Sequence, residues 1–447
     1  MINIEGSFQF LGFLDAFSII LWAVILFSYV SSTANKHKNS SYFKYYNLGF
    51  YVKLFSSIFF SIIYIKLYSG GDSTAYWDTA QKFNNLFWKS PSKYFYELFT
   101  MDPLRMRYNS FDLEVGLPPE WIYKEDEAWF AAKIFSLLTF VTFKSYFAMT
   151  MITAYISFRV SWLLYEVVLK YKIIGERSGA IAALFLPSTC FWCTGITKDM
   201  IIYSAVIYLL IQLFSFLNAE KIKDYRNLIL GSIAVYLILN IRDFMLIAAL
   251  GPFFMAIGAR WSRSQGSGFS KFFIQLLFLG VVFYFMIAFL GSEKGQEFAK
   301  EAGVIQTDLK TNATYSDNRY DLGITDFSPA GMFRAMPISI FTAFYRPFLW
   351  EPGSLFIKIS ALEALVFLIL TIRLLFSGSF MSSLREIRNN ELLMASLIFA
   401  LILGFFAGYT SGLFGVLVRF KSPLLPFLFL VLMYKKQEEI VETDTKT

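Results

Sequence analysis

The chain is poor in charged residues, and this shortage excludes most soluble folds. Only 16% of its 447 residues are Asp, Glu, Lys or Arg, whereas 56% are hydrophobic, and the mean hydropathy is +0.52. A soluble globular domain carries about 25% charged residues. Several apolar runs approach the roughly 20 residues that a helix needs to cross a bilayer. We therefore expect an all-α polytopic membrane protein.

Histidine and cysteine are almost missing as well. The one histidine, His37, and the two cysteines, Cys190 and Cys193, define neither a disulfide framework nor a familiar metal site. Cys190 and Cys193 form a Cys-x-x-Cys pattern, but no βαβ pattern surrounds it, so a redox role is not favoured. The net charge of +7 lies mostly in short loops, without a basic tract interleaved with aromatics, and we expect no nucleic-acid partner.

Hydropathy predicts about eleven spans in a transmembrane domain of residues 1–435. Two of them are short, and residues 180–192 also contain Pro187, so this span should break near the outer leaflet. The predicted spans are 10–30, 50–68, 145–169, 180–192, 200–217, 228–239, 244–259, 272–290, 355–375, 392–409 and 414–433.

Basic residues in the short loops fix the orientation, because such residues favour the cytoplasmic side. They include Lys36, Lys170, Arg226, Arg263, Arg385 and Lys435. This pattern places the N-terminus outside, a tail of residues 436–447 in the cytoplasm, and two large loops, 69–144 and 291–353, on the outer face. The first apolar run lacks a basic leader and is too long for a signal peptide, so we expect it to be retained.

The stretch Gly70-Gly71-Asp72 follows the second predicted span directly. Two glycines allow a sharp turn, and Asp72 is then placed to cap a helix over residues 73–87. Tyr76 shares the face of Asp72, and the apolar side of this helix should lie on the membrane interface. Asp72 is either a helix cap alone or a functional carboxylate.

Further charged residues gather at the predicted outer face. Charges at membrane depth cost about 2.5 kcal/mol or more each, so they tend to face a polar cavity and one another. A cavity rimmed by Lys and Arg suits a phosphate group, and a facing carboxylate suits a general base or a divalent cation. The residues concerned are Lys198, Asp199, Arg242, Asp243, Arg346, Glu351 and Arg419.

Each group also has a structural interpretation. Lys198–Asp199 and Arg242–Asp243 could be pairs at span ends whose long side chains reach toward the membrane surface. Arg346 could form only a local ion pair with Glu351. Glu363 lies inside a span, either as a buried structural partner or as a cavity-lining residue.

Three short motifs carry a resemblance to known families. The pattern Asp72-x-x-x-Tyr76-x-x-x-Ala80 after an early span resembles the first outer loop of GT-C-type, polyprenyl-phosphate-dependent membrane glycosyltransferases. Arg419-Phe420-x-x-Pro423-x-x-Pro426 is similar to a late-span pattern of the same proteins. The segment 187–199, from Pro187-Ser188 to Lys198-Asp199, resembles bacterial envelope-polysaccharide proteins, including Wzy-like polymerases.

The resemblance implies a glycosyltransferase of the bacterial inner membrane, with a polyprenyl-linked sugar donor and membrane lipid as partners. Asp72 would be the catalytic base or a metal-side carboxylate, so a divalent cation is a candidate cofactor. Tyr76 and the charged residues named above would bind substrate. Three alternatives remain: a Wzy-like polymerase led by arginines, a transporter or flippase of an anionic lipid or solute, and a structural membrane subunit.

Overall fold

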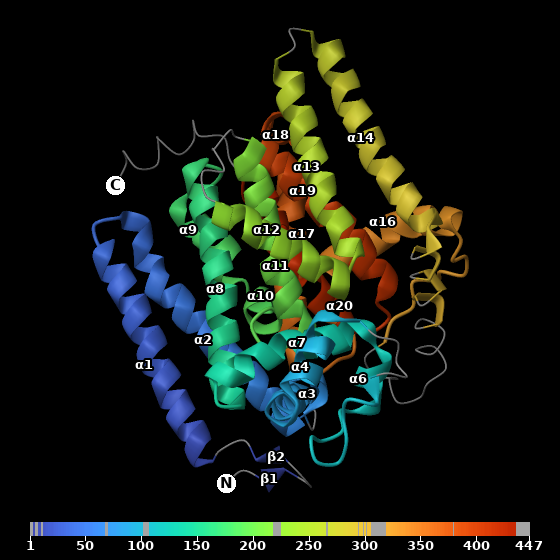
Figure 1. Ribbon diagram of the computed structural model, residues 1–447. Coiled ribbons are helices and arrows are strands. Elements are labelled where there is room, and N and C mark those ends of the chain that lie inside the picture. Colours follow the sequence, from blue (N-terminus) through green and yellow to red (C-terminus); the bar gives the residue numbers. More distant parts are fainter. Residues whose placement is uncertain are drawn as a thin grey trace. The chain divides into compact units, whose positions relative to one another are not determined.

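A computed structural model of the chain confirms a polytopic membrane architecture built from α-helices, with one two-residue strand pair near the N-terminus (Figure 1). It describes residues 3–4, 8–9, 12–67, 70–101, 107–217, 225–264, 267–293, 295–297, 299–300, 302–304, 319–378 and 380–434. Within these residues, 9 helices are long and apolar enough to cross a membrane. The predicted cytoplasmic tail, 436–447, and Lys435 lie outside the described residues.

The difference between nine and the predicted eleven comes from the two short spans. Residues 180–192 are interrupted: α9 (Glu176–Ala180) and the π-helical turn η2 (Ile181–Phe185) end before α10 (Pro187–Trp192). Proline has no N–H and clashes with the preceding turn, so the break at Pro187 follows from the sequence. The second short span, α12 (Tyr225–Ile241), is apolar but has only 17 residues. The count of eleven depends on these two segments.

The chain divides into two compact units. Unit 1 comprises residues 1–163, 190–208 and 232–243, and unit 2 comprises residues 164–189, 209–231 and 244–447.

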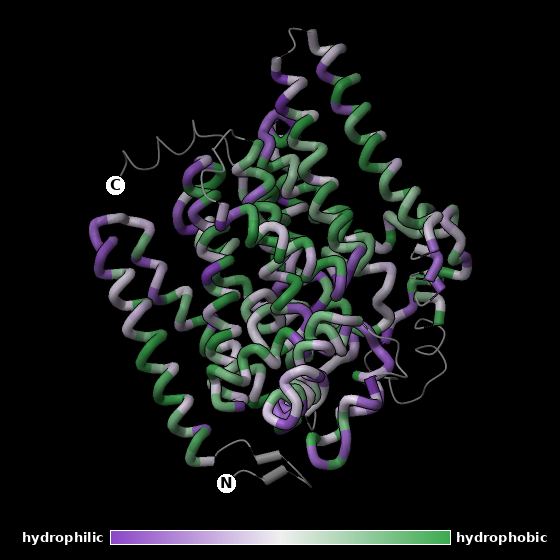
Figure 2. The backbone as a smooth tube through the Cα atoms, in the orientation of Figure 1, coloured by the Kyte–Doolittle hydropathy of each residue, from purple (hydrophilic) through white to green (hydrophobic). Residues whose placement is uncertain are grey.

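In unit 1, α1 (Phe13–Lys36) exposes most of its apolar surface, as expected for a helix facing lipid, and Figure 2 shows this hydrophobic length beside a hydrophilic turn into the next helix. The short helix η1 (Ser41–Phe43) leads into α2 (Lys44–Leu67). Hydroxyl contacts join α2 to α8 (Tyr146–Lys170) in antiparallel order: Ser61 Oγ lies 3.2 Å from Thr150 Oγ1, and Lys53 Nζ lies 3.4 Å from Ser157 Oγ. Two-residue strands β1 (Asn3–Ile4) and β2 (Phe8–Gln9) pair near the N-terminus.

The first large loop folds into a helical domain, here called the α3–α7 domain (residues 71–141, of which 102–106 are not described). Its helices are α3 (Gly71–Lys89), α4 (Pro91–Phe99), α6 (Glu120–Lys124) and α7 (Asp126–Val141). We expected the apolar face of α3 to lie on the membrane interface, and this was wrong. That face packs on α7 and α4, so Trp77, Ala80 and Phe83 are buried inside the protein.

The start of α3 also differs from expectation. Gly70 is the N-cap, with a φ of 105°, and Gly71 has a φ of 54°. Only glycine adopts such angles readily, so both glycines are used by the turn. Asp72 therefore lies inside the first helical turn and is not the cap, although its carboxylate still suits the positive end of the helix dipole.

Unit 2 is organised around α19 (Glu391–Thr410), which packs on α13 (Phe244–Arg263), α16 (Pro329–Tyr345) and α21 (Leu425–Met433). Unit 2 also contains α14 (Gly268–Gly291), which packs on α13, together with α17 (Leu355–Leu375) and α18 (Phe380–Asn389). The approach of α16 to α19 is very close, since a Cβ on Gly408 would lie 2.0 Å from the backbone oxygen of Ser339.

Two segments of unit 2 depart from the sequence prediction. The loop predicted over 291–353 contains α16, a 17-residue helix with Pro337 inside it. The last predicted span, 414–433, is confirmed as long and apolar enough to cross a membrane, but it contains a 3-10 turn: α20 (Phe414–Lys421) passes through η4 (Ser422–Leu424) into α21.

Candidate functional site

The predicted site residues fall into two groups, one in each unit. Unit 1 holds Asp72, Tyr76, Lys198, Asp199, Arg242 and Asp243, and unit 2 holds Arg346, Glu351 and Arg419. Each group is described within its own unit.

In unit 1, the polar turn before α11 (Lys198–Leu217) lies alongside the middle of a helix and not beyond its end. Ser57 Oγ donates to the carbonyl oxygen of Thr194 at 3.0 Å, and a Cβ on Gly195 would lie 2.5 Å from the ring of Phe60. Ser57 precedes the end of α2 by ten residues, or roughly 15 Å at the rise of an α-helix. We expected this turn at the outer surface; instead it enters the bundle, where burial in protein makes irregular backbone tolerable.

A buried ion pair closes this turn. Arg242 Nη1 lies 2.7 Å from Asp199 Oδ1, and the side chains are 7% and 1% exposed. The pair joins the end of α12 to the first turn of α11. The sequence offered Asp243 as the neighbour of Arg242, but Asp243 is half-buried at the next position and the recorded ion pair is with Asp199.

Lys198 makes a looser contact with the α3–α7 domain. Its Nζ lies 3.2 Å from Glu127 Oε2 and 3.7 Å from Glu125 Oε2, whose side chains are about half exposed. Lys198 itself is only 12% exposed. Ion pairs with solvated partners contribute about 0–1 kcal/mol, so an anionic ligand can exchange with these carboxylates at little cost.

Asp72 is half-buried where α3 meets the start of α8. The next residue anchors it, because Ser73 Oγ lies 2.9 Å from Tyr146 OH. Trp77 adds a second anchor by donating from Nε1 to the carbonyl oxygen of Lys144 at 2.8 Å. Tyr76, by contrast, is 1% exposed and packs edge-on against Trp121, which leaves little of its ring surface for a sugar.

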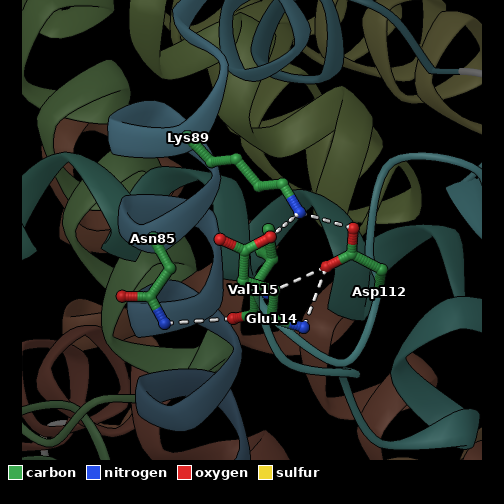
Figure 3. Close-up of polar contacts among 5 residues, drawn as sticks. All are labelled: Asn85, Lys89, Asp112, Glu114 and Val115. Carbon is green, nitrogen blue, oxygen red and sulfur yellow. Dashed lines mark hydrogen bonds and ion pairs between the residues drawn. The ribbon is translucent and has the colours of Figure 1, made fainter.

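Charged contacts on α3 hold the loop that precedes α6 (Figure 3). Lys89 Nζ bonds to Asp112 at 2.7 Å and also to Glu114, while Asn85 Nδ2 donates to the carbonyl oxygen of Val115 at 3.0 Å. The hydrogen bond from Lys89 lowers the pKa of Asp112 to about 2, and backbone N–H groups that donate to the same carboxylate add to this effect.

In unit 2, Arg346 is held by its neighbours. Its Nε lies 2.7 Å from Glu351 Oε1, Nη2 contacts the same oxygen, and the guanidinium stacks on the ring of Tyr320 at 4.5 Å. Glu351 also accepts the N–H of Phe348 at 2.7 Å. The local pair that the sequence allowed is therefore formed, and both side chains help to fix the chain between α16 and α17.

Lys421, not Arg419, is the buried cation of α20. Lys421 is 1% exposed and donates from Nζ to the carbonyl oxygen of Arg346 at 2.6 Å, whereas Arg419 is half-buried. Helical spacing could have revealed the burial of Lys421 from the sequence. Lys421 lies four residues after Leu417 and three before Leu424, so it shares a helix face with these two leucines, which are fully buried.

Sequence reasoning also passed over Lys53, which lies in the middle of α2. Its side chain is fully buried, and its ammonium lies 5.0 Å from the ring centre of Tyr203 in addition to its contact with Ser157. A lysine within a predicted span is a functional candidate by position alone.

The candidate divalent cation finds no ready-made site. The described residues contain no group of three or more His, Cys, Asp or Glu side chains that could hold a metal ion. Hard cations such as Mg²⁺ and Ca²⁺ prefer several oxygen ligands, so Asp72 does not form such a site from described carboxylates alone.

No protein-family model, curated protein or solved structure matches the chain.

Proposed function

We propose that the protein is a membrane glycosyltransferase of the bacterial inner membrane. It moves a sugar or oligosaccharide from a polyprenyl-linked phosphate or diphosphate to an acceptor on the outer, periplasmic face, in envelope polysaccharide or glycoconjugate synthesis. The observation that carries the proposal is the contact of Lys198 with Glu125 and Glu127. It joins a buried cationic turn to the same folded domain that holds Asp72.

In this proposal Asp72 accepts the proton of the acceptor hydroxyl. The hydroxyl oxygen then bonds to the anomeric carbon while the bond from that carbon to the phosphate oxygen breaks. Lys198 releases its glutamates and takes a phosphate oxygen of the leaving group, which lowers the barrier by stabilising the charge that develops there. Arg242 stays with Asp199 and positions the start of α11.

Turnover of a radiolabelled polyprenyl-linked sugar by the purified protein tests the proposal. Loss of a general base costs about 10²- to 10⁴-fold in rate, so Asp72→Asn should reduce kcat by that range. Asp78→Asn is the matched control, since Asp78 lies on the same helix and is paired with Lys82. Full activity of Asp72→Asn, with activity lost in Arg242 and Arg346 variants, would favour a Wzy-like polymerase instead.

A transporter of an anionic lipid or solute is the second candidate, favoured by the two interrupted helices at Pro187 and at Ser422–Leu424. Interrupted helices near the bilayer midplane are common at transport sites. Protein in liposomes that moves a lipid-linked sugar across the bilayer, without transferring the sugar, would establish this function in place of the first.

A further inference from the structure

Two helix interruptions of unit 2 touch each other. Pro187 begins α10 and has no N–H, so the preceding turn lacks one helical donor; Pro426 removes the donor that would serve the carbonyl of Ser422. Thr189 Oγ1 supplies that donor at 3.0 Å from the Ser422 oxygen. The two breaks are thus linked by a side chain and not by helical hydrogen bonds.

The carboxyl group of Glu363, on α17, lies at this crossing. Its Oε1 accepts the N–H of Ser188 at 3.3 Å. Its Oε2 is buried without a hydrogen-bond partner, and the residue is 8% exposed. An ionised carboxylate can accept about four hydrogen bonds, so the charged form is poorly satisfied here.

Among the described residues, Lys421 is the cation that acts on this carboxyl group. Lys421 on α20 is fully buried and favours a negative Glu363 through its charge, but its ammonium is bonded to the carbonyl oxygen of Arg346. Helix α21 carries no titratable residue. On α16, the hydroxyl of Tyr345 donates a hydrogen bond to Thr371 Oγ1 at 3.1 Å. The buried Oε2 atom of Glu363 therefore has a cation in its surroundings but no hydrogen-bond donor among the described residues.

We propose that Glu363 is a proton-binding site. A proton from hydronium bonds to Oε2 while its O–H bond to the hydronium oxygen breaks; the products are a neutral carboxylic acid and a water molecule. The neutral acid is the weaker acceptor, so protonation loosens the Ser188 N–H contact at the break. This role does not depend on the proposed glycosyl transfer.

Infrared difference spectra of the full-length protein in lipid nanodiscs, recorded between alkaline and acidic buffer, test the proposal. Wild type should gain a protonated-carboxyl band that is absent from Glu363→Gln. Glu391→Gln is the matched control, because Glu391 is also buried in unit 2, at 6% exposed, but is directly paired with Arg263; it should keep the band. A band of full size in Glu363→Gln, or none in wild type, would overturn the proposal.

Lys421→Met keeps the proposal falsifiable if Glu363→Gln does not fold. Without the cation, only the hydrogen bonds from Ser188 favour the charged form of Glu363, so the protonated-carboxyl band should persist into the alkaline buffer and the difference signal should become smaller. An unchanged difference signal in Lys421→Met would show that the proton is bound elsewhere.

Discussion

Arg242 Nη1 and Asp199 Oδ1 lie 2.7 Å apart, between side chains that are 7% and 1% exposed. Their residues are far apart in the sequence, and the pair fixes the end of α12 against the start of α11. Removing one partner of a buried pair leaves the other charge uncompensated, which costs far more than the intact pair contributes.

Arg242→Met should therefore lower the free energy of unfolding by about 3–5 kcal/mol, since Asp199 stays buried and charged. The double variant with Asp199→Leu should recover much of the loss, because it removes the remaining charge. Thermal unfolding in detergent measures both effects. Lys124→Gln is the control, as Lys124 pairs with Glu120 at the exposed surface and its loss should change little. Equal destabilisation by the single and double variants would contradict the interpretation.

Lys198→Gln should both raise KM for a lipid-linked donor and lower kcat, because Lys198 contacts phosphate in the bound state and stabilises the further charge that develops on it in the transition state. Steady-state kinetics on the radiolabelled donor measure both constants. Glu127→Gln is the second variant to measure. It removes a partner of Lys198, so Lys198 should bind the donor phosphate more readily and KM should fall. A rise in KM in both variants would show that the pair is structural.

The loop held by Lys89 should loosen in acid. The pKa of Asp112 falls from its ordinary value of 3.8 to about 2 in the folded chain. A depressed pKa stabilises the folded loop fully above the unfolded value, and that stabilisation is lost as the pH falls from about 4 to about 2. Hydrogen exchange at residues 111–116, corrected for intrinsic rates, should rise over this window. Asp112→Asn should show the acid level of exchange already at neutral pH; protection equal to wild type would contradict the prediction.

Gly408→Ala should be strongly destabilising, because the new Cβ would lie 2.0 Å from the backbone oxygen of Ser339, and a backbone atom cannot rotate away. Overpacking of this kind costs about 1–3 kcal/mol or more. Gly280→Ala, in α14, is the matched control: nothing lies within 4 Å of its new Cβ. There the better helix propensity of alanine should stabilise by about 0.5–1 kcal/mol. Thermal unfolding of the two variants should move in opposite directions, and a shared direction would contradict the close approach of α16 to α19.

Lys53→Met should raise the thermal midpoint. The ammonium is fully buried with a hydroxyl and an aromatic ring as its recorded contacts, so an apolar side chain of similar length removes a desolvation cost. Lys66→Met, at the exposed end of the same helix, should change the midpoint little. A clear fall in the midpoint of Lys53→Met would mean that the charge is compensated.

The membrane class and most of the spans were determined by the sequence alone, because hydropathy and span length are local properties that no distant contact alters. Pro187 likewise predicted the break before α10, since the missing N–H belongs to that residue. The sequence also predicted the ion pair of Arg346 with Glu351, because these two residues are near neighbours in the chain.

Three features were decided by the tertiary structure alone. The turn at Thr194 packs beside the middle of α2, the apolar face of α3 packs on α7, and Arg242 pairs with Asp199. Each depends on residues brought from elsewhere in the chain: Ser57 and Phe60, the helix α7, and the start of α11. Apolar side chains look the same in sequence whether lipid or another helix buries them. A buried charge is stabilised by whichever opposite charge the fold places beside it.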